Sequence, residues 1–153
     1  MNKELFKIEL ANKGIELSEQ QVEQYAYYFK RLVEQNKLHN LTSITDEEGV
    51  YEKHFYDSIS VGFGLYLNDL DCLDVGSGGG FPGMPLRIAF PNMKLSILDS
   101  TAKKIVFLDN LAKELNLDNV TPIVSRAEEY KEKKFDVVTA RGVANLTMLL
   151  ELV

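Results

Sequence analysis

Five glycines lie within eight residues of this chain, inside the segment Leu73–Gly83. The glycines follow a short apolar run, Cys72–Val75, and precede a helix-like stretch, Pro85–Phe90. Glycine tolerates positive φ and lets a ligand approach the backbone closely, and five glycines exceed what a tight turn requires. A strand, a glycine-rich loop and a helix in this order predict an α/β fold with a ligand at the loop.

The chain beyond this loop repeats the alternation of strand and helix. Three further short apolar runs are typical of strands: Leu95–Leu98, Val120–Val124 and Phe135–Thr139. Helix-like stretches lie between them, at Thr101–Leu115 and more briefly near Ala127–Lys131. This spacing predicts a parallel, doubly wound sheet, in which right-handed crossovers place helices on both faces.

Residues 1–68 are helical in pattern and contain no proline. Ser18 with Gln21 forms a capping box at the start of one helix. The apolar face expected for that helix comprises Val22, Tyr25, Ala26, Phe29, Leu32 and Val33. We therefore expect a helical part, residues 1–68, in front of an α/β part, residues 69–153.

Two shorter helices are expected in the same part of the chain. The spacing of Leu5, Ile8 and Ala11 favours one before the long helix. Thr45 with Glu48 resembles a second capping box, which would open a helix that ends near Ser60.

Composition excludes several classes of protein. The 153 residues include one cysteine, which rules out an intrachain disulfide, and two histidines, which disfavour a zinc site, so we expect no metal. No apolar run approaches the ~20 residues that span a bilayer, and the N-terminus lacks a secretion signal, so we expect a cytoplasmic location and no membrane partner. The net charge of −6 opposes non-specific nucleic-acid binding, although a local basic patch rather than the sum decides an RNA substrate.

Several ligand classes use a glycine-rich loop of this kind. A phosphate-binding P-loop requires Lys and Ser or Thr after its last glycine, whereas Met84 and Pro85 follow Gly83, so this class is excluded. The run from Gly78 to Gly83 matches the dinucleotide pattern G-x-G-x-x-G, and Asp99 lies 16 residues later. An NAD-dependent oxidoreductase therefore stays open as an alternative.

The residues around the glycines favour a cationic ligand over a dinucleotide. The carboxylate of Asp74 at the end of the first strand would repel a pyrophosphate, and Pro82 and Pro85 remove N–H donors that a pyrophosphate would use. An ammonium and a sulfonium suit this site, which points to S-adenosylmethionine. Asp99, at the end of the second strand, would bind both ribose hydroxyls or cap the next helix. The segment Ser125–Glu129 would contact the adenine edge or form a solvated charge pair.

At these residues the chain resembles the bacterial ribosomal RNA small-subunit methyltransferase G family, also called glucose-inhibited division protein B. The most specific steps are Gly-Phe-Pro-Gly at Gly80–Gly83 and Thr-Ala-Arg at Thr139–Arg141. The resemblance covers nearly the whole chain. The segments that carry it are Asn40–Thr42, His54–Ser58, Leu73–Gly83, Lys103–Leu108, Arg126–Glu129 and Phe135–Arg141.

The resemblance implies a class I methyltransferase fold, with an N-terminal helical cap at residues 1–68 and a Rossmann-like core at residues 69–153. It also implies that the enzyme transfers a methyl group from S-adenosylmethionine to N7 of a specific guanine in 16S ribosomal RNA. The substrate would be the RNA itself or a ribosomal particle. Arg141, at the cofactor and substrate side of the fourth strand, would be the catalytic residue. The residues expected to bind the cofactor are Asp74, Gly76, Gly78, Phe81, Asp99, Ala127, Glu128 and Arg141.

Guanine N7 carries a free lone pair at neutral pH, so the reaction requires positioning more than acid–base chemistry. Arg141 would contact an RNA phosphate, the base O6 or the cofactor, or form a structural ion pair with Asp74 or Asp136. The polar cap residues expected at the substrate cleft are His39, Asn40, Thr42, His54 and Asp57. Three cations are candidates for phosphate contacts or for a solvated helix face: Lys103, Lys104 and Arg126.

Family members are usually longer than this chain, so we expect the sequence to lack the final strands of the class I sheet. The apolar run Leu146–Val153 is expected to form a helix face. The fourth strand, Phe135–Thr139, would then be a sheet edge whose unpaired backbone groups promote self-association. A cofactor-binding fragment without catalysis is therefore a second alternative function.

Overall fold

The computed structural model describes residues 1–76, 78–130, 134–141 and 146–150, with the backbone alone for 141 and 146–150. Its strands form one sheet in the order β3-β2-β1-β4-β5. These strands are β1 (Asp71–Val75), β2 (Lys94–Asp99), β3 (Val120–Val124), β4 (Val137–Arg141) and β5 (Leu146–Leu150). The first four are parallel and their order reverses at β1, which confirms the predicted doubly wound α/β core.

The fifth strand corrects two expectations. Leu146–Leu150 pairs antiparallel with β4, whereas we expected a helix face there. Along the described residues β4 is therefore not a sheet edge, and the self-association predicted through that edge loses its basis. This five-residue segment, apolar except for Thr147, has the length of a strand, and the backbone groups of β4 offer it a ladder of hydrogen bonds.

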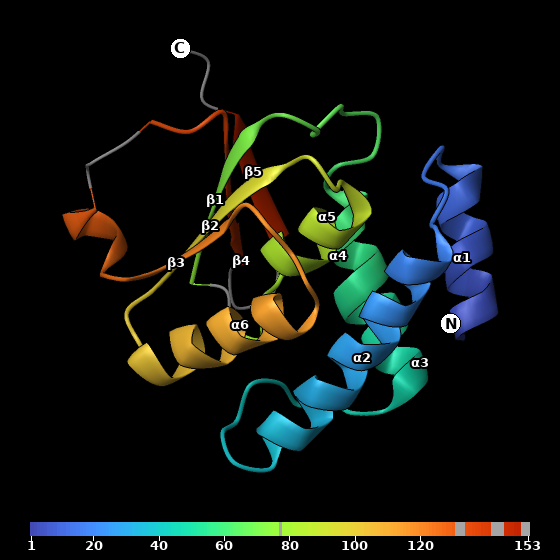
Figure 1. Cartoon of the computed structure of the whole chain (residues 1–153), viewed down its shortest axis with the longest axis horizontal. Helices are drawn as coiled ribbons and strands as arrows, with labels where there is room; N and C mark the ends of the chain where they lie inside the picture. Colours follow the sequence, from blue (N-terminus) through green and yellow to red (C-terminus); the bar gives the residue numbers. More distant parts are fainter. Residues whose placement is uncertain (77, 131–133, 142–145, 151–153) are drawn as a thin grey trace.

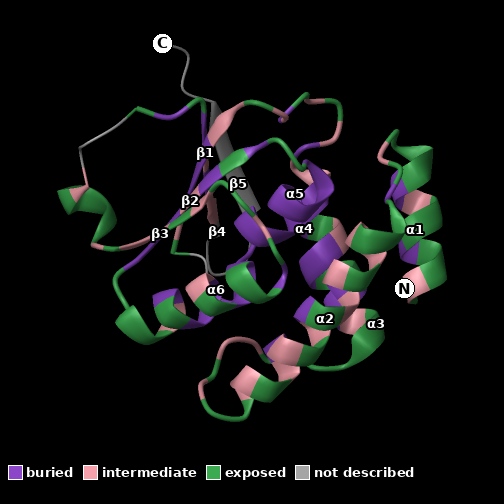
Figure 2. Ribbon diagram, viewed as in Figure 1, coloured by how far each residue is buried: buried purple, intermediate pink, exposed green. Residues whose placement is uncertain are grey.

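The helices gather on one face of the sheet (Figure 1). Two of them, α5 (Gly83–Ala89) and α6 (Ala102–Glu114), connect β1 to β2 and β2 to β3. Every residue of α5 is buried, as Figure 2 shows, because the helix lies between the sheet and the N-terminal helices. The strand residues that face the helices are Cys72, Leu95, Ile97 and Val137.

We expected helices on both faces of the sheet, but the opposite face carries no α-helix among the described residues. Among its described residues, the link from β3 to β4 contains one 3-10 turn, η2 (Ala127–Glu129). This link is short and rich in Glu and Lys, so it offers few apolar residues to cover a sheet. A small cluster lies there instead, formed by Leu73, Leu98 and Phe135 with Val75, Ile123, Tyr130 and Val138.

Residues 1–68 are helical as predicted. The elements are α1 (Lys3–Asn12), α2 (Glu19–Asn36), α3 (Glu47–Gly49), η1 (Val50–Tyr56) and α4 (Asp57–Ser60). The Ser18–Gln21 capping box is confirmed at the start of α2. The division into a cap and a core stays a prediction, since one hydrophobic cluster includes residues from both parts.

Two details of the N-terminal helices differ from the expectations. The carboxylate of Asp46, rather than Thr45, caps α3 by accepting a hydrogen bond from the Gly49 N–H at 2.9 Å. In α1 the side chains of Phe6 and Leu10 are buried, whereas Leu5 and Ile8 are exposed. Sequence spacing identified that helix but selected the wrong face.

The segment η1 is a π-helix that continues α3 and leads into α4. From η1 into α4 the buried residues recur every four positions, whereas an α-helix turns once in 3.6 residues. The wider π-helical turn keeps such residues on one side. The buried pairs are Val50 and Tyr51, His54 and Phe55, and Ser58 and Ile59.

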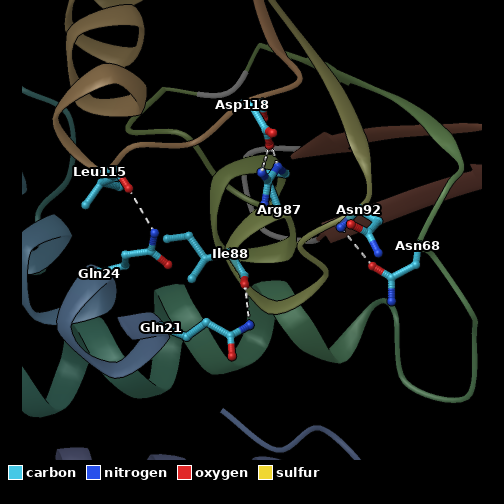
Figure 3. Close-up of polar contacts among 8 residues, drawn as sticks. All are labelled: Gln21, Gln24, Asn68, Arg87, Ile88, Asn92, Leu115 and Asp118. Atoms are coloured by element: carbon cyan, nitrogen blue, oxygen red, sulfur yellow. Dashed lines mark hydrogen bonds and ion pairs between the residues drawn. The ribbon is translucent and has the colours of Figure 1, made fainter. Parts of the chain in front are cut away.

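Side-chain amides fasten α2 to the α/β part of the chain (Figure 3). Gln21 Nε2 donates to the Ile88 carbonyl at 2.8 Å, and Gln24 Nε2 donates to the Leu115 carbonyl at 2.8 Å. Each bond satisfies a carbonyl at a helix end, where no intrahelical donor is available. The two parts are therefore joined by directed hydrogen bonds as well as by apolar packing.

A buried arginine within the α/β part lies close to these contacts. The guanidinium of Arg87 donates to the Asp118 carboxylate at 2.7 Å and to the Asp118 carbonyl at 3.1 Å (Figure 3). Burial lowers the pKa of Arg87, and the hydrogen bond to Asp118 opposes that change. The pair connects α5 to the loop before β3.

Candidate functional site

The glycine loop has one open and one closed side. Gly76 has φ +67°, and a Cβ placed there would meet no atom within 4 Å. Gly80 has φ +104°, and a Cβ there would lie 2.5 Å from Tyr28 Oη and 2.9 Å from Leu108 Cδ2. We call the surroundings of Gly76 the open side of the loop and those of Gly79–Phe81 the closed side. Gly78, with φ +59°, also has open space at its Cβ position.

Aromatic side chains from the N-terminal helices hold the closed side. The hydroxyl of Tyr28 donates a hydrogen bond to the Gly79 carbonyl. The ring of Phe81 stacks on His54, with centroids 4.3 Å apart, and on Tyr28, with centroids 5.7 Å apart. Phe81 is 2% exposed, so its side chain packs into the helices. The cofactor contact predicted for Phe81 stays a prediction.

A buried carboxylate connects the end of the loop to β4. Asp74 Oδ2 accepts a hydrogen bond from the Gly83 N–H at 2.9 Å, and Asp74 Oδ1 accepts one from the Thr139 hydroxyl at 3.0 Å. Asp74 and Thr139 are register partners in β1 and β4, where the strand order reverses. Asp74 therefore fixes the end of the loop to β4. Its contact with the cofactor stays a prediction.

The start of α5 has few N–H groups to offer a phosphate. The Gly83 N–H donates to Asp74, and the Met84 N–H donates to the Gly80 carbonyl at 2.8 Å. Pro82 and Pro85 have no N–H at all. A pyrophosphate at this helix would lack the donors on which dinucleotide-binding folds depend.

A cavity of about 580 Å³ adjoins the open side of the loop, at the carboxyl ends of β1, β2 and β3. Its lining includes four of the residues predicted to bind the cofactor: Gly76, Asp99, Ala127 and Glu128. The other lining residues are Val75, Leu98, Ser100, Thr101, Lys104, Ser125 and Arg126. The cavity contains both acidic and basic side chains.

Asp99 is 6% exposed and lines this cavity. Its Oδ1 accepts a hydrogen bond from the Thr101 N–H at 2.8 Å, which orders the chain before α6. Thr101 is the N-cap residue of α6, so Asp99 orders the chain before the helix and does not itself cap it. The ligand contact of Asp99 stays a prediction, for which the carboxylate has a second acceptor oxygen.

The structure brings together some of the predicted cap residues. Thr42 Oγ1 and His54 Nε2 lie 2.6 Å apart in a hydrogen bond. His39 and Asn40 line a separate cavity of about 220 Å³. Asp57 is exposed at the start of α4. These five residues are thus distributed over three places, and their contacts with the substrate stay predictions.

Arg141 ends β4 at the carboxyl edge of the sheet, one residue beyond the Val75–Ala140 register pair. Its side chain lies outside the described residues. Both ion-pair partners considered for Arg141 from the sequence have other contacts. Asp136 Oδ2 accepts the Asp71 N–H at 2.8 Å, and Asp74 accepts from Gly83 and Thr139. The catalytic role of Arg141 stays a prediction.

Sequence reasoning missed Tyr28, which contacts the glycine loop. The predicted face of α2 passed through Tyr25 and Leu32, and Tyr28 lies three residues from one and four from the other. That spacing was the available signal, because residues three and four apart share a helix face.

Comparison with known proteins identifies the family. The family model described as rRNA small subunit methyltransferase G matches residues 21–153. This chain belongs to that family. Members from Listeria innocua and Limosilactobacillus reuteri, both named ribosomal RNA small subunit methyltransferase G, are 50% and 49% identical to it over 99% of its length. The chain covers 66% of the first relative and 67% of the second, about two thirds of their length.

Among solved structures, the chain is similar to the plantazolicin methyltransferase BpumL in complex with SAH, with a TM-score of 0.48 and 18% identity. The match covers 80% of this methyltransferase G family member and 50% of the other chain. Along the described residues, no helix is long and apolar enough to cross a membrane, and no group of three or more His, Cys, Asp or Glu side chains could hold a metal ion.

Proposed function

We propose that this chain binds S-adenosylmethionine in the 580 Å³ cavity and belongs to an enzyme that methylates N7 of a guanine in small-subunit ribosomal RNA. The observation that carries the proposal is the lining of this cavity. Gly76, Asp99 and the Ala127–Glu128 turn meet there in a member of the methyltransferase G family. The expected place of action is the cytoplasm, where ribosomal subunits are assembled.

The residues present fit this cofactor. The open space at Gly76 admits a ligand close to the backbone, and Asp99 offers an acceptor oxygen to ribose hydroxyls. Ala127 and Glu128 would border the adenine. Lys104 and Arg126 complement the acidic residues of the lining, which suits a ligand that carries charges of both signs. When bound, S-adenosylmethionine supplies an electrophilic methyl group.

The protein's own contribution would be orientation. Guanine N7 has a lone pair and no proton to lose, so no general base is required, and alignment contributes several kcal/mol to lowering the barrier. The carboxylate of Asp74 joins Gly83, at the end of the loop, to Thr139 of β4, and so orders the loop before a ligand binds. Arg141, at the end of the same strand, is the candidate for contacting the target nucleotide.

The NAD-dependent alternative receives little support from the loop. The N–H groups at the start of α5 are already used within the protein or replaced by proline. The buried carboxylate of Asp74 also accepts the Gly83 N–H at the start of α5, where its negative charge would repel a pyrophosphate.

Calorimetric titration with S-adenosylhomocysteine, S-adenosylmethionine and NAD, each separately, tests the proposed cofactor. We expect heat from the first two ligands and none from NAD. Heat from NAD alone would contradict the proposal and favour the oxidoreductase alternative.

Methyl transfer is tested with protein-free small-subunit RNA and with the small ribosomal subunit as substrates. N7-methylguanine is identified by borohydride reduction and aniline cleavage of the RNA at the modified nucleotide. Cleavage at one guanine supports the proposed reaction. Cofactor binding without any methyl transfer would favour the alternative of a binding fragment without catalysis.

A further inference from the structure

A second concave region adjoins the cofactor cavity. Two cavities of about 220 and 280 Å³ share Gln35, His39, Lys103 and Phe107. They form a groove between the carboxyl end of α2 and the first half of α6, which we call the α2–α6 groove. The four residues that the two cavities share do not line the proposed cofactor cavity.

The charge of the groove differs from that of the whole chain. The chain has 23 acidic and 17 basic residues, yet among the described residues no Asp or Glu lines either cavity. Arg31 is bound by Glu34 and Glu114, at 3.3 and 2.8 Å. Lys103 and Lys104 make no ion pair within the described part of the chain. The groove therefore has a local positive potential in an acidic protein.

The groove and the proposed cofactor cavity are neighbours. Thr101 and Lys104 line both the 220 Å³ cavity and the 580 Å³ cavity. A ligand in the groove would thus lie beside the cofactor rather than on a distant surface.

The floor and the walls of the groove suit a nucleic acid strand. Phe107, 3% exposed, contributes an apolar floor, and His39, Asn40 and Gln35 contribute hydrogen-bonding groups. A basic groove with apolar and polar contacts is typical of single-strand binding. In A-form RNA the major groove, which contains guanine N7, is too deep and narrow for side chains, so a target guanine has to be presented by a single strand.

We propose that the α2–α6 groove holds the single-stranded RNA segment next to the target guanine, with Lys103 and Lys104 contacting its phosphates. This inference rests on the proposed function, because it places the substrate beside the proposed cofactor. Lys103 lines the groove and not the cofactor cavity, so its substitution separates the two sites.

The test compares Lys103→Glu with Lys94→Glu, which makes the same charge change at an exposed position on the amino end of β2, at the opposite edge of the sheet. Fluorescence anisotropy measures binding of a short unstructured oligoribonucleotide, and of the same sequence as a duplex, over a range of salt concentrations. Calorimetry with S-adenosylhomocysteine and thermal melting are recorded for every variant.

We expect Lys103→Glu to raise the Kd for the single strand about tenfold and to reduce the slope of log K against log salt by about 0.7. Lys94→Glu should change this Kd less than about twofold, and Lys103→Arg, which keeps the positive charge, should also leave it within about twofold. S-adenosylhomocysteine affinity and melting temperature should be unchanged.

Equal effects of the two glutamate substitutions, tighter binding of the duplex, or absence of RNA binding would overturn the groove assignment. If S-adenosylhomocysteine still binds, the cofactor proposal survives that result. If the unsubstituted chain did not bind S-adenosylhomocysteine, that result would instead contradict the proposed function.

Discussion

The two sides of the glycine loop use the same type of residue for different reasons. At Gly80 a side chain is excluded because Tyr28 and Leu108 already occupy the space. At Gly76 the space is open and adjoins the 580 Å³ cavity. Glycine on the closed side permits packing, whereas glycine on the open side permits a ligand to approach. Substitutions on the closed side should therefore affect stability, and those on the open side should affect binding.

The largest expected effect is that of Gly80→Ala. The added Cβ would overlap Tyr28 Oη, and alanine at φ +104° is strained, so we expect a loss of about 4 kcal/mol in the free energy of unfolding. Chemical denaturation measures it. Gly76→Ala is the matched control, because it adds strain of about 1–2 kcal/mol but no overlap. Equal losses in the two variants would show that the two sides do not differ.

Asp99→Ala tests the open side. We expect it to weaken S-adenosylhomocysteine binding by about 1–3 kcal/mol, because ribose hydroxyls would lose their acceptor. Calorimetry measures the affinity, and denaturation should show a smaller change, since only the Thr101 N–H loses a partner in the protein. An unchanged dissociation constant would mean that Asp99 only orders the start of α6.

The smallest expected effect is that of Tyr28→Phe on the closed side. This substitution removes the hydrogen bond to the Gly79 carbonyl and keeps the ring stacked near Phe81. We expect a loss of about 1 kcal/mol in stability. Tyr27→Phe, which removes a hydroxyl bonded to Glu114 on the exposed face of the same helix, is the control. A larger loss for the control would contradict the importance of the loop contact.

The parts of the fold that depend on local pattern could be predicted from the sequence. Strands β1 to β4 are short apolar runs, and parallel strands bring Gly76, Asp99 and Glu128 to one edge of the sheet. The direction of the Phe81 side chain could not be predicted, because it depends on packing against distant helices. Leu146–Leu150 was predicted incorrectly because a short, mostly apolar run fits either a strand or a helix face.

The shape of the glycine loop depends on the residue spacing in the π-helix η1, because His54 of η1 stacks on Phe81 of the loop. The four-residue repeat of η1 brings His54 to Phe81 while Tyr51 and Phe55 stay in the core. Removing a single exposed residue, such as Glu52, would restore the ordinary α-helical repeat and rotate every later side chain by roughly 100° about the helix axis. The stack on Phe81 would then be lost although no residue of the loop had changed. A deletion in this helix would therefore reach the loop through the packing of Phe81.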